Sequence, residues 1–311
     1  SLHNMNIVTV VVTYNRLVLL KQNIEALKKQ THTPTHIVVI DNCSTDGTAE
    51  FLQTVEGIHV IRTTRNTGGA GGFFDGLKAA AALQADWIWL MDDDTIPHDD
   101  ALEKMLPYTH QPQVGFINSK VVWKDGSQHL MNKVVFAHKE QSKNTSFPNE
   151  MQHKIIRNGS FVSMLIRGDM PFKIGLPYRE FFIWCDDYEY SYRMFSHGFV
   201  GIYAEESVVL HATTENYTPA LENITAQHAW KLYYEERNGT FIYRKHKNPI
   251  VFFFSQLNKI RLQRRLIKKR HLPKDEEHAL LHELTRGLWD GIFFHPKIEW
   301  IDTENLTKKN K

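Results

Sequence analysis

The segment that decides the fold runs from Trp87 to Asp94 and reads Trp-Ile-Trp-Leu-Met-Asp-Asp-Asp. Five apolar residues in a row are typical of a strand buried in a parallel sheet. Three aspartates at the end of such a strand repel one another, and a divalent cation is the usual remedy. Because alternate residues of an extended segment point the same way, Asp92 and Asp94 can share one ion while Asp93 faces elsewhere. The competing interpretation is a solvated helix cap before Pro97.

Three more strands precede this segment, and each is followed by a polar loop. We predict strands over 7–12, 36–40, 58–61 and 87–91, with helices over 17–27, 48–55 and 73–83. Alternating strands and helices favour right-handed crossovers and a parallel sheet, in which ligands bind outside the carboxyl ends of the strands. The polar segments expected at that edge are Thr13-Tyr14-Asn15-Arg16, Asp41 to Gly47, Arg65 to Gly72 and the aspartate triplet.

The glycines of residues 68–72 are expected to present backbone N–H groups at the start of a helix, where phosphate binds readily. They do not form a dinucleotide-binding fingerprint. The run follows the third strand rather than the first, and Phe74 stands where the third glycine belongs. A turn without a binding role is the alternative.

Composition narrows the class of protein. The chain has 311 residues, of which 42% are hydrophobic and 23% charged, so disordered, collagen-like and disulfide-scaffold classes are excluded. Two cysteines, Cys43 and Cys185, favour a reducing compartment. No secretory signal is visible, and the apolar run 250–254 is far shorter than the roughly 20 residues that span a bilayer.

The net charge of +2 hides a basic segment, because residues 244–271 contain ten Lys or Arg and no Asp or Glu. Such a segment attracts the phosphates of nucleic acid or of anionic lipid. Its expected helix over 256–272 shows no single clean apolar stripe. A helix packed on the protein body with solvated basic residues is the alternative.

Acidic and aromatic residues alternate over 181–190, where Asp186, Asp187 and Glu189 lie among Phe, Trp and Tyr. A carboxylate in apolar surroundings has a raised pKa and can act as a base, and aromatic faces stack on sugar rings. A helix N-terminus rich in acidic residues is the alternative. Downstream, a short strand over 208–210 ends in His211. A lone histidine is more often structural than a metal ligand.

Taken together, these motifs resemble family-2 glycosyltransferases with the GT-A fold. The matching pieces are Val12 to Arg16, Asp41 to Gly47, Asn66 to Phe73 and the aspartate triplet. The pattern Asn-x-Gly-Gly-Ala-Gly-Gly-Phe is similar to that of bacterial galactofuranosyltransferases and their rhamnosyltransferase relatives. The resemblance extends from about residue 7 to about residue 238.

The resemblance implies an α/β GT-A fold, with a Rossmann-like, mostly parallel sheet flanked by helices and a helical C-terminal extension. It divides the chain into a nucleotide-sugar-binding half (1–105), an acceptor-binding and catalytic half (106–240) and a basic helical segment (241–311). The implied roles are donor binding by Thr13, Arg16, Asp41, Asn66, Gly68 and Asp93; metal binding by Asp92, Asp94 and His211; catalysis by Asp187; and acceptor binding by Trp184, Asp186 and Glu189.

Two features of the catalytic half depart from this pattern or leave a role open. The galactofuranosyltransferase subgroup places Trp directly before the two aspartates, whereas here Cys185 follows Trp184. The segment Tyr233 to Asn238 resembles a recurrent tyrosine-rich segment of the subgroup. Its Arg237 either holds a phosphate or pairs with a neighbouring glutamate.

We therefore expect an inverting glycosyltransferase that uses Mn²⁺ or Mg²⁺ and transfers galactofuranose from UDP-galactofuranose to a glycan or lipid-linked glycan in cell-surface polysaccharide synthesis. The alternatives are a rhamnosyltransferase that uses dTDP-rhamnose and, from another class, a sugar-phosphate nucleotidyltransferase. The expected location is cytoplasmic, with residues 244–271 on the anionic inner face of the membrane. No nucleic-acid partner is expected, and a homo-oligomer stays open.

Overall fold

The computed structural model describes residues 4–138 and 147–303, which fall into two compact units. The first unit comprises Ser1–Arg179, Asp187–Asn216 and Ile298–Lys311, and the second comprises Glu180–Asp186 and Tyr217–Lys297. The three-part division expected from the sequence concerns function and remains a prediction.

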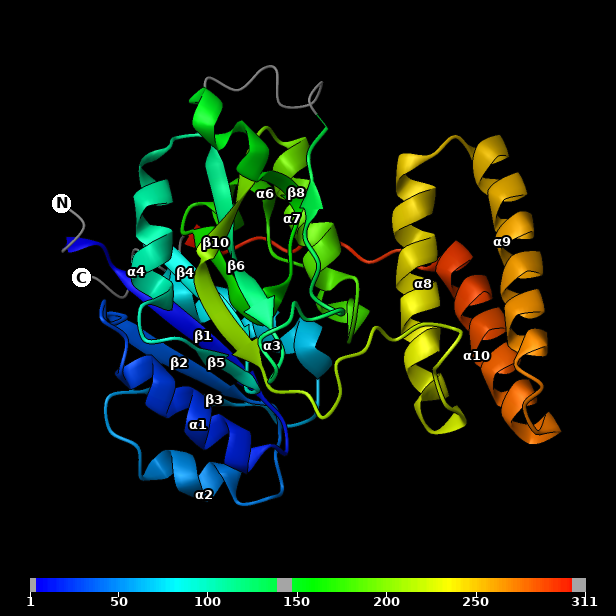
Figure 1. The fold of residues 1–311 in the computed structure, drawn as a ribbon, viewed down its shortest axis with the longest axis horizontal. Helices are drawn as coiled ribbons and strands as arrows, with labels where there is room; N and C mark the ends of the chain where they lie inside the picture. Colours follow the sequence, from blue (N-terminus) through cyan, green and yellow to red (C-terminus); the bar gives the residue numbers. More distant parts are fainter. Residues whose placement is uncertain (1–3, 139–146, 304–311) are drawn as a thin grey trace. The chain divides into compact units, whose positions relative to one another are not determined.

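The first unit is built on a mixed, mostly parallel sheet with the strand order β3-β2-β1-β4-β9-β6-β10-β8-β7 (Figure 1). Strands β1 to β4 are parallel, β9 is antiparallel to both of its neighbours, and β5 pairs with β10. The predicted α/β class and the four predicted strands are confirmed. The strands are β1 (Ile7–Thr13), β2 (His36–Asp41), β3 (His59–Arg62), β4 (Trp87–Asp92), β5 (Thr95–Pro97), β6 (Val114–Val122), β7 (Val135–Phe136), β8 (Ile155–Asn158), β9 (Met164–Arg167) and β10 (Val200–His211).

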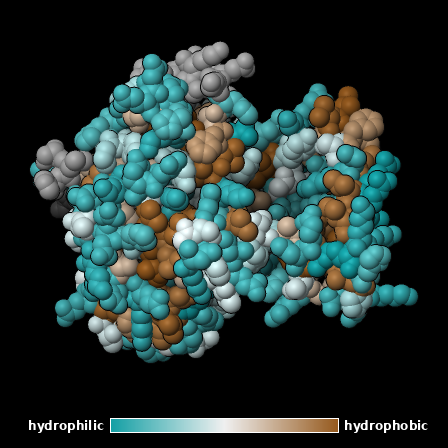
Figure 2. Space-filling view, viewed as in Figure 1, coloured by the Kyte–Doolittle hydropathy of each residue, from teal (hydrophilic) through white to brown (hydrophobic). Residues whose placement is uncertain are grey.

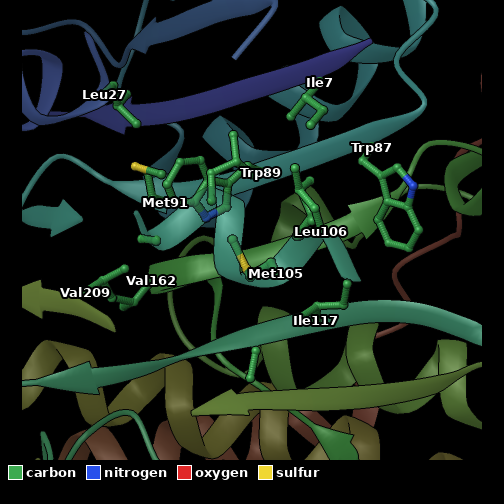
Figure 3. Packing of buried hydrophobic residues seen from close by; sticks show 14 of the residues in the cluster. Ile7, Leu27, Trp87, Trp89, Met91, Met105, Leu106, Ile117, Val162 and Val209 are labelled. Atoms are coloured by element: carbon green, nitrogen blue, oxygen red, sulfur yellow. The ribbon is translucent and has the colours of Figure 1, made fainter. Parts of the chain in front are cut away.

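Helices cover both faces of the sheet, because strands such as β1 carry apolar side chains on both faces. Ile7 and Val11 belong to one apolar cluster, whereas Val8 and Val10 belong to the other, because successive side chains of a strand point to opposite faces. Figure 3 shows the first cluster, in which Trp89 lies between strands and helix. Helices α1 (Leu17–Lys28), α2 (Thr48–Gln53) and α4 (Ala101–Met105) contribute to this cluster, and α3 (Gly68–Ala82), α6 (Met170–Ile174) and α7 (Asp186–Ser196) contribute to the other.

The glycine run lies inside α3, not in a loop before it. The helix begins at Gly68, five residues earlier than predicted, so the turn interpretation is wrong. A Cβ atom on Gly72 would lie 2.4 Å from Val12 Cγ1, and one on Gly76 would lie 2.2 Å from Val10 Cγ1. These glycines therefore let the backbone of α3 contact β1 directly.

The second unit contains the predicted helical C-terminal extension, formed by α8 (Ala229–His246), α9 (Pro249–Lys269) and α10 (Lys274–Phe293). Leu232, Ile267, Leu280 and Leu284 form its apolar core. Among the described residues, no helix is both long enough and apolar enough to span a bilayer. Short 3₁₀ helices complete the two units at Leu106–His110, Asn149–Lys154, Phe161–Ser163, Arg179–Phe181 and Ala226–His228.

Candidate active site

The polar residues that follow β1, β2 and β4 lie at one edge of the sheet. Strand β1 lies between β2 and β4, with Thr13 opposite Asp41 and Val12 opposite Asp92. The expectation that these motifs meet at the carboxyl ends of parallel strands is therefore confirmed.

Arg16 and the aspartate triplet form a network at this edge. Arg16 Nη1 lies 2.5 Å from Asp94 Oδ2 and 3.4 Å from Asp93 Oδ1, and Thr13 Oγ1 donates to Asp93 Oδ2 at 2.9 Å. Burial raises the pKa of Asp93 to about 6, although Arg16 opposes the shift. A short strand, β5, follows the triplet, so the alternative of a solvated helix cap is wrong.

His211 reaches the triplet from the end of β10. The antiparallel pairing of β5 with β10 places His211 opposite Thr95, and Ala212 N donates to Asp94 O at 2.9 Å. His211 Nε2 then lies 3.3 Å from Asp94 Oδ1. Burial tends to raise the pKa of Asp94, but His211 and Arg16 outweigh it and hold this pKa below its ordinary value.

The tautomer of His211 bears on metal binding. Asn132 Nδ2 donates to Ser160 Oγ at 2.9 Å, so Asn132 Oδ1 is left to accept from His211 Nδ1 at 2.6 Å. His211 Nε2 then faces Asp94 Oδ1, a buried oxygen that no hydrogen bond of good geometry reaches. A histidine that binds a metal gives up the proton on its ligating nitrogen, so Nε2 and Asp94 Oδ1 would then both face a shared cation.

The third predicted ligand does not join this pair in the structure. Among residues 4–138 and 147–303, no three His, Cys, Asp or Glu residues lie close enough together to hold a metal ion. Asp94 and His211 are thus brought together, whereas the place of Asp92 in the same site remains a prediction.

A second histidine supports His211. The ring of His129 lies 4.5 Å from that of His211, centroid to centroid. His129 Nδ1 accepts from Met131 N at 3.2 Å, which leaves Nε2 to donate to Thr213 Oγ1 at 2.7 Å. Burial, together with the neighbouring His211, lowers the pKa of His129 to about 4, so this ring is a neutral packing surface near pH 7.

The remaining donor-site candidates surround the end of β2. Asp41 is fully buried, and its carboxylate accepts from Ser44 N at 3.0 Å and contacts Arg62 at 3.4 Å. Asn66 Oδ1 accepts from Gly68 N at 2.9 Å, so these two candidates lie in one local turn. A cavity of about 510 Å³ lies beside them, with Arg62, Arg65 and Lys78 among its lining residues.

Asp187, the candidate base, is the second residue of α7. Its Oδ1 accepts from Tyr188 N at 2.7 Å, and its Oδ2 accepts from Phe161 N at 3.4 Å. Burial raises the pKa of Asp187, whereas these backbone donors and the Ser160 side chain oppose the shift. The first residues of α7 are thus an acidic helix N-terminus, as the alternative interpretation held, and they also include a carboxyl group with a raised pKa.

Glu189 is held by the protein core. Its two carboxylate oxygens accept from Arg193 Nε and Nη2 at 3.0 and 2.6 Å, and both side chains are only 4% exposed. Arg193 Nη1 also donates to the carbonyls of Ile174 and Leu176. A structural ion pair therefore competes with the predicted acceptor contact of Glu189.

Trp184 lies in a strained loop of the second unit. Phe182, Trp184 and Cys185 all have φ near +65°, which is rare for residues other than glycine. Asn238 Nδ2 holds this loop by donating to the carbonyls of Phe181, Ile183 and Trp184 at 2.9 to 3.1 Å.

Arg237, whose role the sequence left open, also contacts this loop. Its Nη2 donates to Glu180 O at 2.5 Å, and its Nε donates to Asn238 Oδ1 at 3.1 Å. Within the second unit, Arg237 and Asn238 therefore support the loop backbone.

The structure also adds three residues for which the sequence assigned no role: Asn132, Ser160 and His129. None of them lies in a recognisable motif. Asn132 is 79 positions from its partner His211. Helix and strand periodicities relate residues only a few positions apart, so they could not predict this contact. For Glu189 a signal did exist, because a residue of opposite charge four positions later on a helix favours an ion pair.

Comparisons with known proteins place this site in a family. Residues 9–169 match the family described as Glycosyl transferase family 2. The chain belongs to this family. A galactofuranosyltransferase of Mycolicibacterium smegmatis is 38% identical over 133 residues, which cover 41% of this chain and 43% of that protein. The O-antigen chain rhamnosyltransferase RfbN of Salmonella typhimurium is 26% identical over 70% of this chain and 69% of its own. The chain spans less than half the length of the curated galactofuranosyltransferases that it matches.

Solved structures confirm the GT-A type of fold. A mannosyltransferase from Pyrobaculum calidifontis, in complex with GDP-Man and Mn²⁺, aligns with a TM-score of 0.55 at 16% identity, covering 93% of this chain and 73% of that one. TarS from S. aureus, in complex with UDP-GlcNAc, aligns with a TM-score of 0.53 at 14% identity and covers 91% and 72% of the two chains.

Proposed function

We propose that this family-2 chain is an inverting, metal-dependent glycosyltransferase that transfers galactofuranose from UDP-galactofuranose to a glycan or lipid-linked glycan. The observation that carries the proposal is the meeting of Thr13, Arg16, Asp94 and His211 at one edge of the sheet. The partial matches at 38–40% identity support galactofuranose as the sugar.

The donor is proposed to bind across the ends of β1 and β2. The Arg16 side chain is 51% exposed, so its guanidinium can reach a diphosphate while it contacts the aspartates. Asp41 and Asn66 lie beside the base, Gly68 lies beside the phosphates, and the basic cavity near Arg62 gives space for the nucleotide. The complexes of structural neighbours with GDP-Man and UDP-GlcNAc support a nucleotide-sugar donor.

The metal ion is proposed to be held by Asp92, Asp94 and His211. Carboxylate and imidazole ligands suit Mn²⁺ or Mg²⁺, and the unpartnered Asp94 Oδ1 opposite His211 Nε2 supports the assignment. When bound, such an ion neutralises the charge that develops on a departing nucleoside diphosphate.

Asp187 is proposed to accept the proton of the acceptor hydroxyl as this group attacks the anomeric carbon. Its raised pKa makes it a stronger base than an ordinary aspartate. Trp184 and Asp186 are proposed to contact the acceptor.

The test replaces Asp187 with Asn. Transfer should fall by at least 10²-fold, the usual contribution of a general base, while UDP affinity stays almost unchanged. Product mass spectrometry with candidate UDP-sugars and a lipid-linked acceptor reports transfer. A variant that retains a tenth of wild-type turnover would remove Asp187 from this role.

Two alternatives remain, and each has its own measurement. The rhamnosyltransferase match covers 70% of the chain, so dTDP-rhamnose is the second donor candidate. Thermal stabilisation by dTDP-rhamnose, without stabilisation by UDP or UDP-galactofuranose, would favour it. A nucleotidyltransferase would release pyrophosphate from a nucleoside triphosphate. Such enzymes usually carry a glycine-rich loop after the first strand, whereas Thr13-Tyr14-Asn15-Arg16 contains no glycine.

Helix α9 is proposed to bind an anionic membrane surface. Spacings of three and four residues place eight exposed side chains on one face of the helix, apolar over the first turns and basic beyond them. Figure 2 shows hydrophobic surface over the start of α9. A surface that inserts apolar side chains and presents cations beside them fits anionic lipid. These residues are Ile250, Phe253, Phe254, Leu257, Arg261, Arg264, Arg265 and Lys268.

Vesicle co-sedimentation tests this surface. Each Lys or Arg near an anionic surface contributes about 1 kcal/mol, so changing Arg264, Arg265, Lys268 and Lys269 to Gln should abolish binding to anionic vesicles. High salt should have the same effect, and activity on a soluble acceptor should survive. The matched control removes four exposed lysines of the first unit: Lys21, Lys28, Lys104 and Lys124. Equal losses in both variants, or binding that is insensitive to salt, would refute the proposal.

A further inference from the structure

A chain of hydrogen-bonded side chains connects the two halves of the proposed chemistry. Starting from the candidate base, it runs from Asp187 to Ser160, then to Asn132, and ends at His211 beside Asp94. Ser160, Asn132 and His211 are all less than 8% exposed, and all the members lie in the first unit. Water therefore competes little for these hydrogen bonds.

The hydrogen bonds of this chain have a fixed direction. Asn132 Nδ2 and Val162 N both donate to Ser160 Oγ, which leaves the hydroxyl hydrogen of Ser160 to donate to the Asp187 carboxylate. Ser160 Oγ is then an acceptor for Asn132 Nδ2 at 2.9 Å, and Asn132 Oδ1 is an acceptor for His211 Nδ1 at 2.6 Å. This order of donors and acceptors places the proton of Nδ1 on the Asn132 side of the ring and leaves Nε2 facing Asp94.

We propose that Asn132 and Ser160 are positioning residues that couple the proposed metal ligand His211 to the proposed base Asp187 through this chain. The inference rests on the proposed function, since it assigns partners to two of its residues. Asn132 fixes the tautomer and the ring orientation of His211, as outer partners of ligating histidines commonly do. Ser160 supplies a hydrogen bond to the ionised form of Asp187.

The experiment compares three variants in two measurements. Mn²⁺ affinity is measured by electron paramagnetic resonance titration, without turnover, and the pH profile of kcat is measured with saturating donor. Asn132→Ala should weaken Mn²⁺ binding about 10- to 100-fold, because His211 loses its orienting acceptor. Ser160→Ala should leave Mn²⁺ affinity within a few-fold and move the acidic limb of the profile up by about one pH unit, because Asp187 loses a donor.

Asn132→Asp separates coupling from simple structural support. A carboxylate at position 132 still accepts from His211 Nδ1, so Mn²⁺ affinity should be retained. It also accepts the Ser160 hydrogen and removes it from Asp187. The acidic limb should therefore move up as in Ser160→Ala, although the residue replaced is not in contact with Asp187 in the chain. A residue with only a structural role would not shift the pH profile while leaving Mn²⁺ affinity unchanged.

The matched control is Ser163→Ala, at the end of the 3₁₀ helix Phe161–Ser163 that Ser160 caps. The Ser163 hydroxyl bonds Trp89 and Ser119, outside the chain, so both measurements should stay at wild-type values. The coupling is refuted if Asn132→Ala binds Mn²⁺ with wild-type affinity. It is also refuted if Ser160→Ala and Asn132→Asp both keep the wild-type pH profile. Neither result contradicts the proposed function. A wild-type protein that binds no Mn²⁺ would overturn the proposed function as well. If Asn132→Ala does not fold, the other two variants decide.

Discussion

Replacing Glu189 distinguishes a structural role from the acceptor contact expected from the sequence. Glu189→Ala leaves the Arg193 guanidinium 4% exposed and without the carboxylate that binds two of its nitrogens. Removing one partner of such a buried pair costs about 3–5 kcal/mol of unfolding free energy. For a unit of this size the melting temperature should fall by roughly 10 °C.

The control uses the same spacing at the surface. Glu25 and Lys29 also form an i,i+4 pair at 2.7 Å, but their side chains are more than 60% exposed. Glu25→Ala should therefore leave the free energy of unfolding almost unchanged, because water screens this exposed pair. Replacing both Glu189 and Arg193 with Met should recover most of the stability, because no unpaired charge stays buried.

The assays are thermal and urea denaturation, together with acceptor kinetics, on the same preparations. If Glu189 is structural, Glu189→Gln should lower stability while the remaining folded enzyme keeps its KM for the acceptor. An unchanged melting temperature together with a raised acceptor KM would refute this reasoning and restore the predicted acceptor contact.

Three further perturbations test other parts of the site. Asp94→Ala or His211→Ala should weaken UDP binding in the presence of Mn²⁺ and not in its absence; equal calorimetric losses under both conditions would contradict the metal assignment. Burial lowers the pKa of His129 from 6.5 to about 4, so between these two pH values the imidazole is protonated in the unfolded chain but not in the folded protein. Lowering the pH from 7 to 5 should therefore remove about 1–2 kcal/mol of stability, and His129→Gln should flatten that slope in urea denaturation. Asn238→Ala should release the loop over 182–185, raise its hydrogen exchange and lower kcat/KM for the acceptor about 10-fold; unchanged exchange would show that the loop holds its own conformation.

The sequence predicted those parts of the site that local patterns encode. The apolar run before Asp92 identified β4, and strand alternation placed the ends of β1, β2 and β4 at one edge. Strands that alternate with helices can form only a few sheet topologies, and the alternation itself is visible in the short-range hydrophobic pattern. This edge of the sheet could therefore be predicted from the sequence.

The remaining parts depend on long-range packing. The glycines of α3 appear polar and flexible in sequence, yet Gly72 serves close contact with Val12. Only the position of β1 beneath the helix reveals that role. Asn132 and Ser160 lie beside the site because β10 ends next to them, with His211 bonded to Asn132. These residues are far apart in the sequence, so no local pattern predicts the contact.

The hydrogen bonds from Asn238 to the loop over residues 181–184 have a consequence for how the sequence of this loop can vary. Within this loop Asn238 Nδ2 donates only to backbone carbonyl oxygens, which every amino acid supplies, so these hydrogen bonds do not depend on the side chains of residues 181–184. Mutation can therefore exchange the groups displayed on this loop while the backbone path is inherited unchanged. The loop resembles the hypervariable segments of binding proteins, where a constant framework carries variable contacts. Libraries that vary residues 182–184 and keep Asn238 accordingly test whether this loop contacts the proposed acceptor, because the backbone path is held constant.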